Sequence, residues 1–222
     1  MAVFHAVIIG GGGTGGALAH DLALRGLQVT LVERGEVTSG TTGRHHGLLH
    51  SGARYAVKDH ESAIECIEEN MILRKIAPGS FEENDGLFVA VTEEDVEYGN
   101  DLIEGCAECG IPTQRLTREE AWALEPNLSP SLIMALRVPD ASMDAMRMPL
   151  RFFATAKKNG AVVKTYTQVL DVRIEGGTAR GVHVMDLTSG REYEIGADIV
   201  INAAGPWSGY IAEMAGVEVP IR

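Results

Sequence analysis

The sequence is poor in aromatic residues, in cysteine and in positive charge. Phe, Tyr and Trp make up 5% of its 222 residues, and 19 Lys and Arg stand against 31 Asp and Glu, for a net charge of -12. This acidic balance argues against nucleic acid as a partner and against a polybasic membrane patch. No apolar run approaches the ~20 residues of a membrane span, and no signal peptide precedes the first apolar stretch. We therefore expect a cytoplasmic protein.

The three cysteines are too few for a metal cluster. Cys106 and Cys109 form a C-x-x-C within a helical pattern, and Cys66 is the only other thiol. Zinc and iron–sulfur sites need about four ligands, and a redox C-x-x-C belongs in a thioredoxin-like βαβ context that is absent here. The histidines at 45–50 lack a supporting carboxylate cluster. We predict no metal site and two incidental helix cysteines in a reducing compartment.

Glycine, in contrast, is abundant, and it gathers at the start of the chain. An apolar run, Val7-Ile8-Ile9, leads into seven residues of which six are glycine, and an Ala/Leu-rich stretch follows. Gly10, Gly12 and Gly15 fit G-x-G-x-x-G after a buried strand, where they allow a sharp turn, close approach of a pyrophosphate and tight helix–strand packing. The register one residue later also fits. We prefer the first because it begins directly at the end of the strand.

A second predicted strand supports the dinucleotide interpretation of this motif. Residues 28–32 are β-prone and end in Glu33, which lies 18 residues beyond Gly15. A carboxylate about 20 residues beyond the motif binds a ribose hydroxyl and disfavours the 2′-phosphate of NADP. The alternative is a glycine-rich turn in another α/β protein, with Glu33 merely solvated.

The order of the remaining elements differs from the plain nicotinamide-binding pattern. A Gly/Ser/Thr/His-rich loop fills 34–55, and Pro149 should distort or delay the helix that we expect Asp144 to cap. We expect helices at 59–76, 92–109, 117–126, 144–159 and 208–215, and strands at 86–91, 131–138, 162–167, 169–174, 179–187, 191–195 and 197–201. A βαβ start, an insertion, a return helix, a β-meander and a last strand ending in Ala-Ala-Gly match a two-part flavoprotein. That last strand should end beside the first glycine turn.

Several stretches carry a resemblance to a known family. They are Val7 to Gly16, Ala23 to Gly26, Thr41 to Arg44, Gly47 to Tyr55, Glu65 to Ile67, Val138-Pro139-Asp140 and Val200 to Trp207. The chain resembles FAD-dependent glycerol-3-phosphate dehydrogenases, within the D-amino-acid oxidase-like flavoproteins, and is most similar to the A-type subunit of the anaerobic enzymes. Those proteins are more than twice as long, so the chain looks like an N-terminal portion.

The resemblance implies an α/β fold with a discontinuous FAD-binding domain. That domain would be Rossmann-like, of the glutathione-reductase type with a β-meander, and would comprise residues 1–77 and 145–222. Residues 78–144 would be part of an inserted α+β substrate domain. FAD would be the cofactor, and the residues implied to bind it are Gly10, Gly12, Thr14, Gly15, Glu33, Arg34, Thr41, Thr42, Gly47, Leu48, Leu49, Val169, Ala203, Ala204, Gly205 and Trp207.

Three residues are candidates for catalysis. His50 is a candidate base because histidine titrates near neutral pH, or it hydrogen-bonds the flavin or the backbone without proton transfer. Arg54 can bind a substrate phosphate bidentately or form a structural ion pair. Tyr55 orients the substrate or packs.

The expected function is oxidation of sn-glycerol 3-phosphate to dihydroxyacetone phosphate. Electrons would pass from the flavin to a quinone or another acceptor, with partner subunits providing electron transfer and peripheral attachment to the membrane. The alternatives are a related flavin enzyme acting on an amine or 2-hydroxy acid, a truncated FAD-binding module without activity, and a plain NAD-binding protein. The loop at 40–49 and the last strand disfavour the plain NAD-binding protein.

Overall fold

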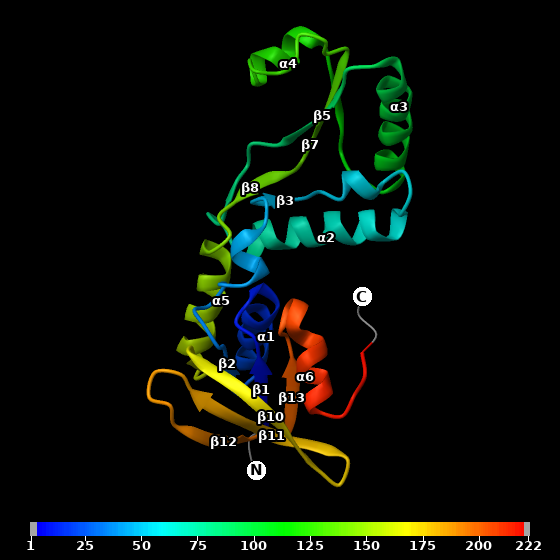
Figure 1. The fold of residues 1–222 in the computed structure, drawn as a ribbon. Coiled ribbons are helices and arrows are strands. Elements are labelled where there is room, and N and C mark those ends of the chain that lie inside the picture. The colour runs from blue at the N-terminus through cyan, green and yellow to red at the C-terminus, as the bar shows by residue number, and fades with distance from the viewer. Residues whose placement is uncertain (1–3, 220–222) are drawn as a thin grey trace. The chain divides into compact units, whose positions relative to one another are not determined.

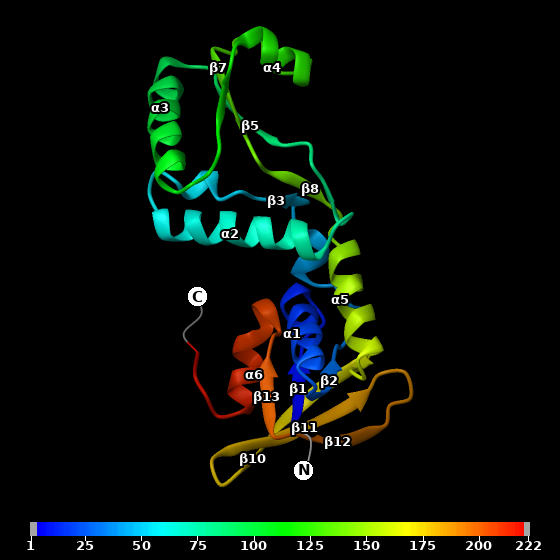
Figure 2. The same ribbon diagram turned by 180° about the vertical axis from the view of Figure 1, so that it is seen from behind.

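The computed structural model describes residues 4–219, whose contacts divide the chain into two compact units. Unit 1 combines Met1–His45 with Ala145–Arg222, and unit 2 is His46–Asp144. Residues 46–77, which we assigned to the FAD-binding domain, group with unit 2, because their strand and helix pair and pack within it. Which part binds cofactor and which binds substrate remains a prediction. The elements of both units are labelled in Figure 1 and seen from behind in Figure 2.

Unit 1 is built on a four-stranded parallel sheet with the order β13-β1-β2-β9. A three-stranded antiparallel meander, β10-β11-β12, accompanies it. The elements are β1 (His5–Ile9), α1 (Gly13–Leu24), β2 (Gln28–Val32), η1 (Thr41–Arg44), α5 (Arg147–Lys158), β9 (Val162–Lys164), β10 (Thr167–Glu175), β11 (Thr178–Asp186), β12 (Glu192–Gly196), β13 (Ile199–Asn202), η3 (Gly205–Trp207) and α6 (Ser208–Met214). A βαβ start followed by a meander is the expected architecture, and it is confirmed.

The alternation of side chains along β1 produces three layers in unit 1. Ile8 faces a cluster that includes Ala19 of α1 and Phe153 of α5. Val7 and Ile9 face the opposite side, against valines of β10 and β11 and apolar residues of α6. Both faces of the sheet are therefore covered, as a parallel sheet with continuous apolar strands requires. In Figures 1 and 2, α1 and α5 lie above the strands of the meander.

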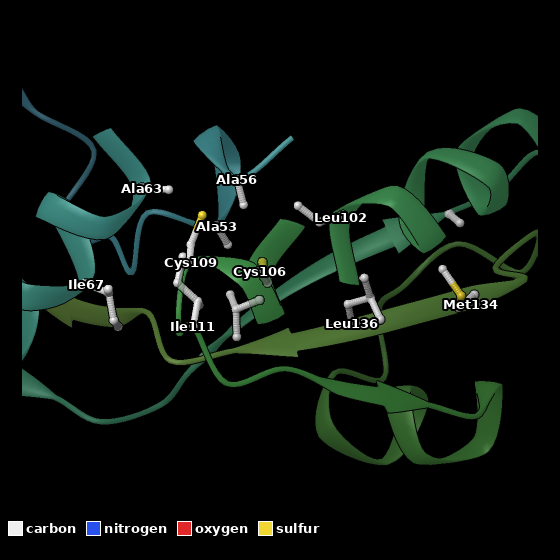
Figure 3. Close-up of a cluster of buried hydrophobic side chains, with 12 residues drawn as sticks. Ala53, Ala56, Ala63, Ile67, Leu102, Cys106, Cys109, Ile111, Met134 and Leu136 are labelled. Atoms are coloured by element: carbon white, nitrogen blue, oxygen red, sulfur yellow. The ribbon is translucent and has the colours of Figure 1, made fainter. Parts of the chain in front are cut away.

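Unit 2 contains two small antiparallel sheets, with the orders β5-β7-β6 and β3-β8-β4. Its elements are β3 (Leu48–Leu49), η2 (Ala53–Tyr55), α2 (His60–Ile76), β4 (Phe81–Glu82), β5 (Gly86–Ala90), α3 (Glu93–Glu108), β6 (Gln114–Leu116), α4 (Arg118–Leu124), β7 (Met134–Val138) and β8 (Ala141–Met143). One face of β7, with Met134 and Leu136, packs with α2 and α3 (Figure 3). The other face, with Ala135, packs with α4.

Most long elements lie where the sequence predicts them, and the differences have local causes. The helix expected from Asp144 begins instead at Arg147, with Met146 as N-cap, because Pro149 is tolerated only in the first turn. The strand expected at 162–167 ends at Lys164, and a new strand begins at Thr167 after Tyr166, whose φ is 50°. The strands β3, β4, β6 and β8 are two or three residues long and were not predicted.

Candidate functional site

The glycine turn after β1 has the geometry of the preferred register. Gly10 has φ 110°, and a Cβ there would lie 2.4 Å from the carbonyl oxygen of Ala203. A Cβ on Gly15 would lie 1.9 Å from the carbonyl oxygen of Gly10, so only glycine lets α1 pack this closely. β13 runs parallel to β1, and the N–H of Ala203 donates to the carbonyl of Ile9 at 2.8 Å. The expected meeting of the last strand with the first turn is confirmed.

Glu33 is held in place at the carboxyl end of β2. Its Oε2 accepts from the N–H of Gly11 at 2.7 Å, and its Oε1 accepts from the N–H of Gly35 at 2.8 Å. A Cβ on Gly11 would lie 2.9 Å from Cβ of Glu33, which explains why that position is also glycine. A carboxylate has about four lone-pair sites. After two backbone contacts, Glu33 therefore keeps acceptor capacity for ribose hydroxyls.

A cavity of about 880 Å³ opens at this edge of the unit 1 sheet. Its volume lies within the roughly 300–1,000 Å³ range of cofactor and ligand pockets. It is lined by Ile9, Gly10, Gly11, Gly12, Gly13, Thr14, Val32, Glu33, Arg34, Ser39, Gly40, Thr41, Thr42, Arg44, Thr167, Gln168, Val169, Ala203, Ala204, Gly205, Pro206, Trp207, Tyr210, Ile211 and Met214. Every predicted cofactor residue of unit 1 lines this cavity except Gly15, which packs against Gly10.

The N-terminus of α1 at this cavity has no side-chain cap. Gly12 is the N-cap, no side chain bonds to it, and the first turn carries no acid. The helices α2, α3 and α4 all have capping side chains and acidic first turns. On α1, the Thr42 hydroxyl accepts from the N–H of Gly13 at 2.9 Å. Thr42 thus takes one N–H of the first turn, and a helix N-terminus whose own N-cap residue is a glycine suits a pyrophosphate.

An aromatic side chain borders the cavity on the η3 side. The Arg34 guanidinium lies 4.7 Å from the centre of the Trp207 ring, within cation–π distance. A Cβ on Gly40 would approach the same ring to 3.4 Å. The Arg44 guanidinium donates to the carbonyl of Gly40 at 2.7 Å and also to that of Ser39. The loop that we expect to run along the cofactor therefore contacts Trp207, which follows β13.

In unit 2, His50 is paired with a carboxylate that the sequence analysis did not assign to the site. His50 Nδ1 lies 2.9 Å from Oδ2 of Asp140, which is buried. The other carboxylate oxygen accepts from both the N–H and the hydroxyl of Ser51, each at 2.7 Å. The His46 ring lies 4.8 Å from that of His50 between centroids. This is the arrangement of a histidine oriented by a carboxylate.

Arg54 and Tyr55 are exposed neighbours on η2 of unit 2. The Arg54 guanidinium lies 5.3 Å from the centre of the Tyr55 ring. Arg54 takes part in none of the ion pairs among residues 4–219. Its guanidinium is therefore open to an anion. Gly47, Leu48 and Leu49, the remaining predicted cofactor residues, also belong to unit 2, with the last two forming β3.

Burial disfavours the thiolate form of the three cysteines. Burial raises the pKa of Cys106 to about 11, and burial also raises the pKa of Cys66 and Cys109 above the usual thiol value. A thiol that stays protonated is a poor nucleophile and metal ligand. Within residues 4–219, no group of three or more His, Cys, Asp or Glu side chains is placed to hold a metal ion.

Asp140, Ser51, Asn70 and Arg74 are the functional candidates that sequence reasoning missed. Val138-Pro139-Asp140 carried the family resemblance without a role being given to its carboxylate. Asn70 lies in α2 and is 1% exposed. A buried amide within a helix is a usable signal, because a buried polar side chain needs a partner.

The βαβ start, the glycine turn and the meander of unit 1 define a chain with the fold of the dinucleotide-binding flavoproteins. The glycine turn, the carboxylate of Glu33 and the N-terminus of α1 all border a cavity that is large enough for a cofactor. Residues 5–222 match the DAO family, the FAD dependent oxidoreductases, and the chain belongs to that family.

Relatives with established names are similar over almost the whole chain. The A1 subunit of the anaerobic glycerol-3-phosphate dehydrogenase of Haloferax volcanii is 49% identical over 97% of the chain, which covers 38% of that protein. The corresponding subunit of the Escherichia coli K12 enzyme is 45% identical over 96% of the chain, which covers 39% of that protein. The chain thus spans about two fifths of the length of these curated relatives.

Solved structures share the fold. L-proline dehydrogenase from P. horikoshii superposes with a TM-score of 0.80 at 30% identity, over 99% of this chain and 57% of that one. The glycerol-3-phosphate dehydrogenase of Bacillus halodurans, complexed with FAD, gives 0.72 at 25% identity over 96% and 36%. Among residues 4–219, no helix combines the length and apolar character needed to cross a membrane.

Proposed function

We propose that this chain belongs to an enzyme that oxidises sn-glycerol 3-phosphate to dihydroxyacetone phosphate with FAD. The observation that carries the proposal is the similarity, at 45–49% identity over 96–97% of the chain, to proteins named as subunits of anaerobic glycerol-3-phosphate dehydrogenases. Membership in the DAO family supplies the cofactor class.

The reaction removes a hydride from C2 of the alcohol and a proton from its hydroxyl. FAD, when bound, supplies the two-electron acceptor for the hydride. Removal of the hydroxyl proton requires a base. His50 Nε2 takes it, since Nδ1 is engaged with Asp140 and the side chain is 29% exposed.

The remaining predicted site residues have roles in binding. Arg54 binds the substrate phosphate, which its lack of an ion pair supports, and Tyr55 beside it orients the substrate. Gly10, Gly12 and Thr14 receive the pyrophosphate, and Glu33 receives the ribose. The further cofactor contacts that we propose are Gly15, Arg34, Thr41, Thr42, Gly47, Leu48, Leu49, Val169, Ala203, Ala204, Gly205 and Trp207.

The test is a spectroscopic titration. The chain is reconstituted with FAD, freed of excess cofactor and mixed anaerobically with sn-glycerol 3-phosphate. We expect the oxidised-flavin band to disappear, and Arg54→Lys to require a higher substrate concentration because a lysine cannot bind phosphate bidentately. Bound flavin that stays oxidised with this substrate would contradict the proposal for the chain as it stands, and would favour an FAD-binding module without activity.

A second candidate activity is oxidation of an amine. The observation behind it is the likeness to L-proline dehydrogenase from P. horikoshii, which is 30% identical over 99% of this chain. Arg54 can bind a carboxylate as well as a phosphate. Flavin reduction by L-proline, without reduction by sn-glycerol 3-phosphate, would establish this candidate.

We place the protein in the cytoplasm, with peripheral attachment to the membrane through partner subunits. The relatives are themselves named as subunits of a larger enzyme, which supports the existence of partners. A quinone is the acceptor that we propose for the electrons. Co-purification of the chain with membranes only when partner subunits are co-expressed would support this arrangement, and membrane binding by the chain alone would contradict it.

A further inference from the structure

Three buried polar side chains surround the backbone of His50. Ser51 has no exposed surface, Asn70 is 1% exposed and Asp140 is 7% exposed. Burying a polar group is costly unless it is hydrogen-bonded. Asp140 bonds to both His50 and Ser51, and the Asn70 amide donates to the carbonyl of His50. Each of the three buried side chains therefore has a hydrogen-bond partner within unit 2.

The two oxygens of Asp140 have different partners. Oδ1 accepts two hydrogen bonds from Ser51, one from its N–H and one from its hydroxyl. Those donors fix the plane of the carboxylate and leave Oδ2 directed at His50 Nδ1. An ionised carboxylate only accepts hydrogen bonds. With Asp140 ionised, this contact requires the proton on His50 Nδ1 and leaves the lone pair of the neutral ring on Nε2.

Helix α2 holds the two segments that carry this pair. The Asn70 amide donates to the carbonyl of His50 at 3.0 Å, and Asn70 Oδ1 accepts from Arg74 Nε at 2.7 Å. Arg74 Nη2 donates to the carbonyl of Pro139 at 2.8 Å. One helix thus fixes both the residue before Asp140 and the backbone of His50, although His50 and Asp140 lie 90 positions apart.

The same geometry excludes a serine hydrolase arrangement. In such an arrangement the serine hydroxyl bonds to the histidine, and the histidine bonds to the carboxylate. Here the Ser51 hydroxyl donates to Asp140 and is fully buried. Ser51 supports the carboxylate and cannot act as a nucleophile.

We propose that Asp140 is a positioning residue that fixes His50 in the Nδ1–H tautomer and presents Nε2 as the proton acceptor. The identity of the proton that Nε2 accepts rests on the proposed function, whereas the tautomer does not. Two further ionisable or charged groups lie beside the His50–Asp140 pair, namely the His46 ring and the Arg74 guanidinium, which is also 3.5 Å from Glu83.

The first test reads the tautomer directly. In the ¹⁵N-labelled chain, ring-proton correlations assign the protonated nitrogen of each neutral imidazole at alkaline pH, and His50→Gln identifies the His50 signals among the seven histidines. We expect Nδ1–H in the wild type. Nε2–H in the folded wild type would overturn the proposal, and no variant needs to fold for that result.

The second test changes the carboxylate. Asp140→Asn can donate its amide to Nδ1, so we expect the Nε2–H tautomer and, in the FAD-loaded enzyme, a fall in kcat of about 100-fold or more with KM little changed. Asp140→Glu, which keeps the carboxylate, should restore part of the Nδ1–H tautomer and part of kcat. The matched control is Glu192→Gln, which removes the carboxylate 3.1 Å from His183 in unit 1 and should leave the His50 signals and kcat unchanged.

The outcomes separate the two proposals. Nδ1–H in the wild type without oxidation of sn-glycerol 3-phosphate would retain the positioning role and contradict the proposed function. Folded Asp140→Asn with an unchanged His50 tautomer and unchanged kcat would overturn the positioning role, whatever the substrate is.

Discussion

Glu33 illustrates how a single side chain can serve both the fold and a ligand. Its two oxygens accept the N–H groups of Gly11 and Gly35, and its carboxylate also lines the unit 1 cavity. The carboxylate therefore braces the glycine turn before any cofactor is bound. The acid that follows the second strand was predictable from spacing alone, but its bracing of Gly11 was not.

We expect Glu33→Gln to weaken both stability and FAD binding. A glutamine offers one acceptor oxygen, so one of the two backbone N–H groups loses its partner, at a cost of about 1–3 kcal/mol. The ribose also loses a charged acceptor. Thermal unfolding and FAD titration measure the two effects. Glu36→Gln is the matched control, because Glu36 bonds to Tyr166 outside the cavity. Equal FAD affinity in the two variants would contradict the role of Glu33.

At the scale of elements, the helix N-termini divide into two kinds. The helices α2, α3 and α4 are capped by Asp59, Thr92 and Thr117, whereas α1 begins at a glycine with no side-chain cap. Caps satisfy N–H groups that would otherwise need water or a ligand. Of these four helices, the one without a capping side chain begins at the cavity. α6 also begins without a side-chain cap, so the absence of a cap marks a site only together with the cavity and the glycine turn.

The capping box of α3 predicts a pH dependence of stability. The N–H groups of Val91 and Thr92 and the Thr92 hydroxyl hold the pKa of Asp95 below its usual value of 3.8. A carboxyl whose pKa is lowered by folding stabilises the fold above the unfolded pKa and loses that contribution as pH falls through the folded pKa.

Asp95→Asn should therefore flatten the acid limb of stability. The free energy of unfolding, measured by urea titration from pH 6 down to about pH 2, should fall less steeply in the variant than in the wild type. The slope should not vanish, because the pKa values of Asp59 and Asp186 are also lowered by hydrogen bonds. Asp101→Asn, on the same helix but outside the cap, is the control. Identical acid slopes for both variants would refute the assignment.

The sequence predicts the long elements well because their signals are local. The capping boxes at Thr92 and Thr117 and the glycine turn each lie within a few residues. The short strands β4, β6 and β8 exist only through pairing with distant partners, so no local period marks them. The site shows the same division between local and distant signals. The cavity residues are predictable from the glycine motif and the family resemblance, whereas the contact of Asp140 with His50 joins residues 90 positions apart.

At the scale of the whole molecule, the chain divides its candidate groups between two units. The cavity with Glu33 belongs to unit 1, and His50, Arg54 and Asp140 belong to unit 2. Each unit also has its own reporter. Trp207 borders the cavity, and Cys106 is buried in the core of unit 2 (Figure 3). Cofactor binding and unfolding can therefore be observed unit by unit.

FAD should stabilise unit 1 by an amount that grows with the logarithm of the free FAD concentration above Kd. A ligand that binds only the folded state adds RT ln(1 + [L]/Kd), or about 2.7 kcal/mol at a hundredfold excess over Kd. In Trp122→Phe, Trp207 is the one indole left. We expect FAD to quench its fluorescence and to raise the urea concentration at which that fluorescence reports half-unfolding. Alkylation of Cys106 follows unit 2 in the same samples, because this protonated, buried thiol reacts only after opening.

The control ligand is NADP, whose 2′-phosphate Glu33 should repel. A Trp207 midpoint that NADP raises as much as FAD does would show that the cavity lacks the selectivity that Glu33 implies. A midpoint that FAD leaves unchanged would remove the cavity of unit 1 as the cofactor site.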